Sequence, residues 1–263
     1  MSLQGKTVWI TGASSGIGEA LALDLSSRDV TLVLSARRAD ELERVRARCA
    51  RPERVHVLPM DVAKTDDAAA NVDRAIALAG PIDVMVHNAG IGQRALALDT
   101  PLAEDRRIME LNYFGVVALT KALLPSMQKR RTGHFVVVSS VTGYVGTQYR
   151  TAYAASKHAL HGFFEGLRAE VFADGIAVTM ICPGFVRTEI AKKALAAAGT
   201  PNADGHHATE GGIAPEVAAR AIGKAIDRRK REVYVGGGEI AGIYLRRFLP
   251  GVLAQTLRRV KTT

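Results

Sequence analysis

A tyrosine and a lysine four residues apart are the side chains best suited to proton transfer. Tyr153 and Lys157 belong to Thr151-Ala-Tyr-Ala-Ala-Ser-Lys157, which has a helical pattern, so they share one helix face. A phenol, with a pKa of about 10, is a poor base at neutral pH, and an adjacent ammonium lowers that pKa. Ser140 ends an apolar stretch and can hydrogen-bond a substrate oxygen beside the phenol. The Tyr–Lys spacing is common on helices and becomes specific only beside a redox cofactor.

A glycine-rich segment near the N-terminus has the composition of a phosphate-binding turn. Thr11-Gly-Ala-Ser-Ser-Gly-Ile-Gly18 follows an apolar stretch and precedes a helical pattern that starts at Glu19. Glycines let the backbone approach a ligand, and the N–H groups of a helix start attract an anion. The spacing G-x3-G-x-G is a weak indication alone, because glycines also serve plain turns. Its strand–turn–helix context predicts a dinucleotide site, formed by Gly12, Ser14, Ser15, Gly16, Ile17 and Gly18.

Two arginines follow the second apolar stretch, where an NAD-binding fold carries a carboxylate for the ribose. The sequence there is Ser35-Ala-Arg-Arg38 and holds no carboxylate. Arg37, next to Arg38, can pair with a 2′-phosphate through two charge-assisted hydrogen bonds. The alternative is a solvated helix start, which leaves unexplained why cations oppose the helix dipole there. The segment therefore predicts NADP(H) as the cofactor.

These residues lie in or next to short β-branched stretches that alternate with longer helical patterns. Strands are expected at about 6–11, 30–35, 54–60, 82–87, 134–139, 176–182 and 232–235. Helices are expected at about 16–27, 39–49, 66–79, 102–130, 151–173 and 215–228. Several strands are apolar on both faces, as a parallel sheet covered by helices on both sides requires. The alternation predicts an α/β fold built from repeated βαβ units.

Length and composition exclude several classes of protein. The 263 residues suit one large domain, 1–263, and the 48% apolar content is too high for disorder. Two cysteines make no disulfide framework, and no apolar run approaches the ~18 residues of a membrane span. No leader precedes the first strand, so a cytoplasmic setting is expected. The net charge is +9, but residues 228–263 alone carry +7, which argues against a uniformly basic nucleic-acid binder.

Taken together, the motifs resemble those of the short-chain dehydrogenases/reductases. The matching residues, in order, are Thr11–Gly18, Asp61-Val62, Asn88-Ala-Gly90, Asn112, Ser140, Tyr153-x3-Lys157 and Pro183-Gly184. The match covers about residues 5–235. It implies a doubly wound Rossmann-type three-layer sandwich with a mostly parallel seven-stranded sheet, and hydride transfer between NAD(P)(H) and an alcohol/carbonyl pair. His87 stands where the family usually has an asparagine that stabilises the sheet, so it puts little of the chemistry in doubt.

The resemblance also implies a role for each matching residue. Tyr153 would be the acid/base, and Lys157 would hold the nicotinamide ribose and lower the tyrosine pKa. Ser140 would orient the carbonyl, and Asn112 would anchor a water in a proton relay. Further cofactor contacts are expected at Asp61, Val62, Asn88, Ala89, Gly90, Pro183, Gly184, Val186 and Thr188. Substrate contacts are expected at Ser140, Thr142, Tyr149, Tyr153 and Phe185.

Three further segments concern the substrate and the partners. Residues 150–189 and the basic C-terminus resemble most the branch that contains dehydrogenase/reductase member 7 and its bacterial relatives, which suggests a lipophilic carbonyl such as a steroid, a retinoid or a fatty-acyl derivative. The family resemblance also implies a homodimer or homotetramer. A substrate lid is expected near 188–212. Residues 239–263 have the pattern of a basic amphipathic helix pair that docks on a membrane surface, on a second subunit or over the substrate cleft.

A second hypothesis is an NADP(H)-binding sensor or scaffold without turnover. Binding alone needs neither the serine nor the acid, so the complete set favours an enzyme: Asn112, Ser140, Tyr153 and Lys157. His158 and His161 find no third ligand at helical spacing, so no metal is expected. Cys49 and Cys182 are expected to be free thiols.

Overall fold

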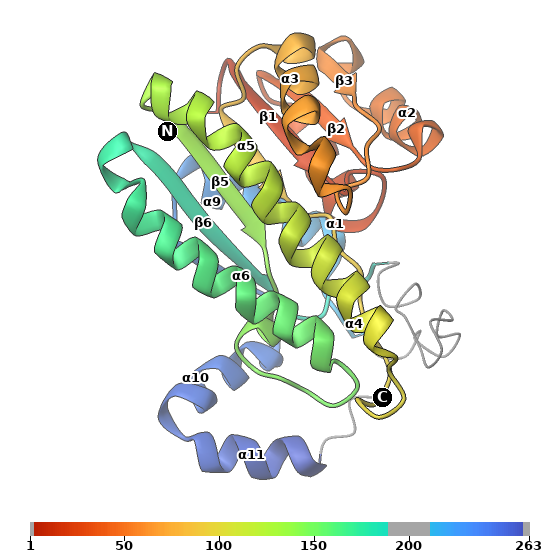
Figure 1. Cartoon of the computed structure of the whole chain (residues 1–263), viewed down its shortest axis with the longest axis vertical. Coiled ribbons are helices and arrows are strands. Elements are labelled where there is room, and N and C mark those ends of the chain that lie inside the picture. The colour runs from red at the N-terminus through yellow and green to blue at the C-terminus, as the bar shows by residue number, and fades with distance from the viewer. Residues whose placement is uncertain (1–2, 189–210, 260–263) are drawn as a thin grey trace.

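A single parallel sheet forms the centre of the computed structural model, which describes residues 3–188 and 211–259. The strand order is β3-β2-β1-β4-β5-β6-β7, so the chain winds outward from β1 in one direction and then from β4 in the other (Figure 1). The strands are β1 (Lys6–Thr11), β2 (Val30–Ser35), β3 (Val55–Val57), β4 (Val84–His87), β5 (Gly133–Val138), β6 (Ile176–Pro183) and β7 (Glu232–Val235). The predicted doubly wound sheet is confirmed, and most of the predicted lid, 189–210, lies outside the described residues.

Helices cover both faces of the sheet. One face is covered by α1 (Gly16–Ser26), α2 (Ala39–Arg48) and α9 (Pro215–Asp227), and the other by α3 (Ala68–Ala79), α5 (Gly115–Arg130) and α6 (Thr151–Glu170). The structure also contains α4 (Leu102–Met109), α10 (Ala241–Phe248) and α11 (Pro250–Arg259). The helix expected at 102–130 is α4 and α5 joined by a π-helical turn, Glu110–Phe114. In Figure 1, α5 and α6 lie side by side over β5 and β6.

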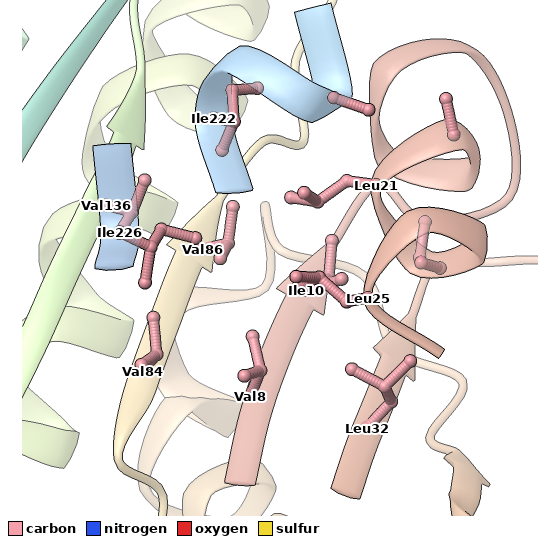
Figure 2. Close-up of a cluster of buried hydrophobic side chains, with 14 of the residues drawn as sticks. Val8, Ile10, Leu21, Leu25, Leu32, Val84, Val86, Val136, Ile222 and Ile226 are labelled. Carbon is pink, nitrogen blue, oxygen red and sulfur yellow. The ribbon is translucent and has the colours of Figure 1, made fainter. Parts of the chain in front are cut away.

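Alternation along the strands divides the apolar side chains between two cores. In β1, Val8 and Ile10 face the core under α1 and α9, whereas Trp9 faces the core under α3, α5 and α6. Figure 2 shows Val8 and Ile10 packed with Leu21 of α1 and Ile222 of α9. Successive side chains of a β-strand point to opposite faces of the sheet, which explains this division. Because all seven strands are parallel, their carboxyl ends meet at one edge, with the topological switch between β1 and β4.

The basic C-terminal segment forms two helices separated at Leu249, directly before Pro250, as its pattern predicts. Arg246 of α10 hydrogen-bonds the Tyr144 carbonyl and His158 Nε2, which fastens the helix to the loop after β5 and to α6. Ile243 is buried, but four apolar side chains of this segment are more than half exposed: Tyr244, Phe248, Leu249 and Val252. Among the described residues, no helix has both the length and the apolar content needed to span a bilayer.

His87 is fully buried at the end of β4, and this makes the fold sensitive to acid. Its Nε2 lies 2.9 Å from Thr120 Oγ1, which itself donates to the Val116 carbonyl. Burial lowers the pKa of His87 from 6.5 to about 3. Below pH 6.5 the histidine is therefore protonated in the unfolded chain but stays neutral in the folded protein. The stability of the fold consequently decreases as the pH falls from about 6.5 toward 3.

Replacing His87 with asparagine should flatten this pH dependence. At pH 5 the native histidine costs about 2 kcal/mol of stability relative to pH 7, from 1.36 kcal/mol per pKa unit. Urea unfolding measures the free energy of unfolding at pH 7 and at pH 5. Between these two pH values the His87→Asn variant should lose about 2 kcal/mol less of this free energy than the native protein does. The control is His56→Asn, at a half-buried histidine. This variant should lose as much free energy of unfolding between pH 7 and pH 5 as the native protein. Equal losses in the His87 variant and the native protein would contradict this account.

Candidate active site

A cleft of about 380 Å³ lies at the carboxyl edge of the sheet. Segments after β1, β2, β3, β4, β5 and β6 line it, so six connections from strand ends converge on one space. Of the residues that the sequence predicts for the site, all but four line the cleft. The four that do not are Gly18, Asn112, Thr142 and Tyr149.

The glycine turn is held against the end of β4. Gly12 has a φ of +65°, and a Cβ there would lie 2.8 Å from the Ala89 Cα, so only glycine fits. Asn88 Nδ2 donates to the carbonyls of Thr11 and Gly12, each at 3.1 Å. At Gly18 a Cβ would meet the Gly12 carbonyl, so Gly18 supports the turn from behind the cleft. The turn is therefore a rigid backbone cradle at the start of α1.

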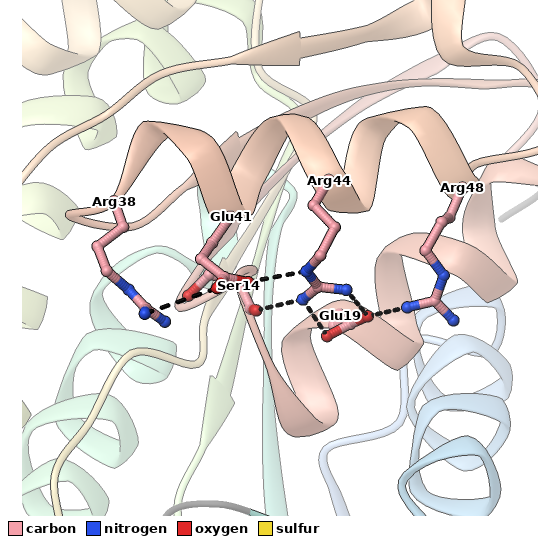
Figure 3. A network of polar contacts seen from close by, with 6 residues as sticks. All are labelled: Ser14, Glu19, Arg38, Glu41, Arg44 and Arg48. Atoms are coloured by element: carbon pink, nitrogen blue, oxygen red, sulfur yellow. Dashed lines mark hydrogen bonds and ion pairs between the residues drawn. The ribbon is translucent and has the colours of Figure 1, made fainter.

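A network of ion pairs fastens α2 to this turn, as Figure 3 shows. Arg44 donates to both oxygens of Glu19, at 2.8 and 3.0 Å, and to the Ser14 carbonyl at 3.1 Å. Arg48 adds a second cation to Glu19, and the hydrogen bond from Arg44 is the main reason that the pKa of Glu19 is lowered. The sequence patterns did not predict this network, because Glu19 and Arg44 are 25 positions apart.

Arg37 and Arg38 stand at the start of α2 with different surroundings. Both are exposed and line the cleft. Arg38 forms an ion pair with Glu41 at 3.6 Å (Figure 3), whereas Arg37 has no hydrogen-bond or ion-pair partner among residues 3–188 and 211–259. Arg37 is therefore the one of the two with its guanidinium available to a ligand.

The predicted serine, tyrosine and lysine come together at the other end of the cleft. Tyr153 and Lys157 lie on α6, and Ser140 follows β5, all three buried. The Lys157 Nζ donates to the Val138 carbonyl at 2.9 Å and lies 5.6 Å from the centroid of the Tyr153 ring. A hydrogen bond joins Ser140 to Tyr153.

The electrostatics of the phenol differ from the expectation. Burial raises the pKa of Tyr153, while the charge of Arg150 and the hydrogen bond with Ser140 lower it. Lys157, expected to lower this pKa, is not among the groups that act on it, and burial lowers the pKa of Lys157 itself to about 8. The reason is geometric, since the Lys157 ammonium lies over the ring and donates to a backbone carbonyl.

Asn112 lies in the π-helical turn and is completely buried. Its side chain accepts from the Ile91 amide at 2.9 Å, donates to the Ile91 carbonyl at 3.0 Å and donates to Ser156 Oγ at 3.1 Å. The side chain thus joins the loop after β4 to α6, and its amide is used in doing so. A water held by Asn112 would have to bind its backbone.

Two of the predicted substrate contacts do not line the cleft. Thr142 is buried in the loop after β5, where its amide donates to Ser140 Oγ at 3.1 Å. Tyr149 has a φ of 63°, and its carbonyl accepts from the Ala95 amide at 3.2 Å. Phe185, another of the predicted substrate contacts, lines the cleft.

Gln93 is a site residue that the sequence patterns did not indicate. Its side chain is 2% exposed, and its Oε1 accepts from the amides of Ala152 at 2.8 Å and Tyr153 at 3.3 Å. Its Nε2 donates to Thr100 Oγ1 at 2.8 Å. Gln93 therefore caps the first turn of α6, and it joins the helix that carries the phenol to the loop after β4.

Replacing Gln93 with leucine should destabilise the protein by about 2 kcal/mol, because two buried amides lose their acceptor. Chemical denaturation at neutral pH measures this loss. The matched control is Gln128→Leu, which removes an exposed hydrogen bond to Asp174 and should cost less than about 0.5 kcal/mol. A Gln93 variant as stable as the native protein would show that water replaces the cap.

His161 and Cys182, considered separately in the sequence, form one polar cluster with Glu232. The ligand atoms of His161, Cys182 and Glu232 lie within 4.8 Å of one another. Cys182 Sγ donates to Glu232 Oε1 at 3.4 Å, and the Tyr144 and Tyr234 hydroxyls donate to the same carboxylate. Cys49 and Cys182 are both free and buried. The cluster is a hydrogen-bonded support beneath the loop after β5.

The fold and the cleft define a doubly wound nucleotide-binding protein with a phenol, a hydroxyl and an ammonium at the reactive end of its cleft. Residues 6–198 match the short chain dehydrogenase family, and the chain belongs to that family of oxidoreductases. The predicted resemblance is therefore confirmed.

Relatives and solved structures agree with this assignment. The chain is 43% identical over 257 residues to the dehydrogenase/reductase SDR family protein 7-like of Anopheles gambiae, covering 95% of this chain and 81% of that protein. A short chain dehydrogenase/reductase from Burkholderia phymatum in complex with NAD is 25% identical, with a TM-score of 0.85 over 97% of this chain and 96% of that one. An alcohol dehydrogenase from Thermococcus sibiricus complexed with 5-hydroxy-NADP is 26% identical, with a TM-score of 0.76 over 90% and 98%.

Proposed function

We propose that the protein is an NADP(H)-dependent oxidoreductase that interconverts a carbonyl and an alcohol by hydride transfer. One observation supports this above the others. A buried phenol, hydrogen-bonded to Ser140, opens onto the same cleft as the glycine turn and an unpaired Arg37, all within the described residues. A proton donor and a dinucleotide site in one cleft are what carbonyl reduction requires.

The residues of the cleft fit a nicotinamide dinucleotide. Gly12 and Gly16 both have a positive φ, and a Cβ on Gly16 would lie 3.1 Å from Thr188 Cγ2. Because neither residue carries a side chain, a ligand can approach the backbone at the start of α1. The two solved relatives bind NAD and an NADP derivative. When bound, the cofactor supplies or accepts the hydride. The proposed preference for a cofactor with a 2′-phosphate depends on Arg37, with Arg38 beside it. The other predicted cofactor contacts stay proposals: Asp61, Val62, Asn88, Ala89, Gly90, Pro183, Gly184, Val186 and Thr188.

In carbonyl reduction, Tyr153 donates its phenolic proton to the substrate oxygen, and in alcohol oxidation it takes that proton back. Burial raises the pKa of Tyr153 and keeps the phenol protonated at neutral pH, which suits the reductive direction. Ser140 donates a hydrogen bond to the same oxygen and orients the carbonyl. Lys157 holds the nicotinamide ribose, and the charge of Arg150 together with the hydrogen bond from Ser140 stabilises the phenolate that remains.

Asn112 completes the proposed proton path. Since its side chain bonds Ile91 and Ser156, its backbone in the π-helical turn is the group that would hold the relay water. A buried path of this kind returns a proton to Tyr153 without opening the cleft to bulk water.

The proposed substrate is a lipophilic carbonyl compound. Ile91, Leu111 and Phe185 support this proposal, because they line the cleft with apolar surface. Ser140, Tyr153 and Phe185 are the proposed substrate contacts. Thr142 and Tyr149, which do not line the cleft, stay proposals as substrate contacts.

The assembly and location are proposed from the C-terminal helices. The chain forms one domain, 1–263, with a basic extension from residue 239. The exposed apolar residues of α10 and α11 support contact with a second subunit, in a homodimer or homotetramer, or peripheral contact with a membrane. A cytoplasmic location remains the proposal, and no contact with nucleic acid is proposed.

An activity panel tests the function against its rival, a sensor that binds NADP(H) without turnover. Purified protein is incubated with NADPH and with small ketones, quinones, steroids or acyl-thioesters, and NADPH oxidation is followed. Turnover of a lipophilic ketone supports the enzyme. Tight NADPH binding with no turnover of any of these compounds supports the sensor and contradicts our proposal.

A further inference from the structure

The wall of the cleft carries far more positive charge than the cofactor accounts for. Among the described residues that line it, six are arginine or lysine and one, Asp61, is acidic. Arg37 and Arg38 stand at the proposed 2′-phosphate end, and Lys157 at the ribose. Three arginines remain without a role in the proposed function: Arg94, Arg107 and Arg150.

Hydrogen bonds from the two neighbours of Arg94 tie its loop to the segment that carries Arg150. The Gln93 side chain donates to Thr151 Oγ1 at 3.4 Å, and the Ala95 amide donates to the Tyr149 carbonyl at 3.2 Å. Thr151 and Tyr149 are the two neighbours of Arg150, so the bonds place the two arginines in the same part of the cleft wall. Arg107 differs, because it is exposed and pairs with Glu104 at 3.6 Å.

Two guanidinium groups at one place repel each other. Arg150 is half-buried, and its side chain has no hydrogen-bond or ion-pair partner in the part of the chain that the structure describes. Burial and the charge of Arg94 both lower the pKa of Arg150. Arg150 is also close enough to Tyr153 for its charge to act on the phenol. A half-buried cation without a counter-ion is destabilising, so the position favours binding of an anion.

The cofactor's pyrophosphate is poorly placed to be that anion. The glycine turn follows β1, whereas Arg150 precedes α6 and follows β5. β4 lies between β1 and β5, so the two sites are separated by two strand spacings, about 10 Å. The arginines belong to the substrate end of the cleft, beside Tyr153.

We propose that Arg94 and Arg150 form an anion-binding subsite, and that the substrate is a carbonyl compound with an apolar body and a carboxylate or phosphate group. This inference rests on the proposed function, which supplies the carbonyl and Tyr153. The planar guanidinium of each arginine matches such an oxyanion with paired hydrogen bonds. The anion would anchor the substrate while the carbonyl oxygen meets the phenol.

Matched probes test the subsite by binding as well as by turnover. Titration calorimetry, with and without NADP⁺, compares 4-acetylbenzoate, 4-acetylphenyl phosphate and methyl 4-acetylbenzoate. At least one of the two anions should bind about tenfold more tightly than the ester, and which one does identifies the group. NADPH oxidation with the same three compounds is measured in parallel.

The variants are Arg94→Gln and Arg150→Gln, each checked by thermal unfolding. Each should bring the anion and the ester to within about twofold of each other in affinity, since the charge-assisted bonds are lost. The control is Arg106→Gln, an exposed neighbour that does not line the cleft, and it should keep the preference. Because Arg94 lies in a loop, its variant remains informative if Arg150→Gln fails to fold.

The outcomes separate the two proposals. Equal binding of the ester and both anions by the native protein overturns the subsite, and so does a preference that survives in both variants. Anion binding that depends on the arginines, without NADPH oxidation, supports the subsite and contradicts the proposed reaction for these compounds. If Arg150 acts only on the Tyr153 phenol, Arg150→Gln changes kcat equally for acid and ester, which also overturns the subsite.

Discussion

Replacing Tyr153 with phenylalanine should lower kcat/KM for carbonyl reduction by about a thousandfold, because the proton donor is removed. The ring remains, so the packing on α6 and the contact with Lys157 are retained. NADPH affinity, measured by fluorescence titration, should change less than about threefold. The phenol is 8% exposed, and its loss leaves Ser140 as the only hydroxyl at that end of the cleft among the predicted catalytic residues.

A tyrosine outside the site provides the control. Tyr244 on α10 is 53% exposed, and Tyr244→Phe should retain full activity. A Tyr153→Phe enzyme within about tenfold of the native rate would show that water or another group supplies the proton, and the assignment of the acid would be withdrawn.

Arg37→Glu should reverse the choice of cofactor. A carboxylate at this position repels a 2′-phosphate and accepts a hydrogen bond from a 2′-hydroxyl. We expect the ratio of kcat/KM for NADPH to that for NADH to fall by about a hundredfold, the effect of losing a charge-assisted pair and adding a repulsion. Steady-state kinetics with both cofactors measures this ratio.

The neighbouring arginine is the matched control. Arg38 is tied to Glu41, so Arg38→Gln should change the ratio by less than about fivefold. If instead Arg37→Glu leaves the ratio unchanged while Arg38→Gln lowers it, the wrong arginine has been assigned. No change in either variant would remove the electrostatic basis of the NADP(H) proposal.

The candidate site shows how far sequence patterns reach. The glycine turn, the Tyr–Lys pair and the arginines after β2 were found because each depends on neighbours a few residues apart. Lys157 was assigned an effect on the Tyr153 pKa that Arg150 has instead, because spacing on a helix does not say where an ammonium points. Thr142 and Tyr149 are predicted at the substrate because they lie near Ser140 in the chain, but neither lines the cleft.

The sequence by itself determined the alternation of strands and helices, the order of the motifs and the side of the sheet on which they gather. Backbone periodicity and hydrophobic burial act over short stretches, so they can be recognised without a structure. Only the tertiary structure decided that Gln93 caps a helix 59 positions away, or that the charge of Arg94 acts on Arg150. Such contacts depend on the paths of loops, which the packing of the whole chain sets and no local pattern encodes.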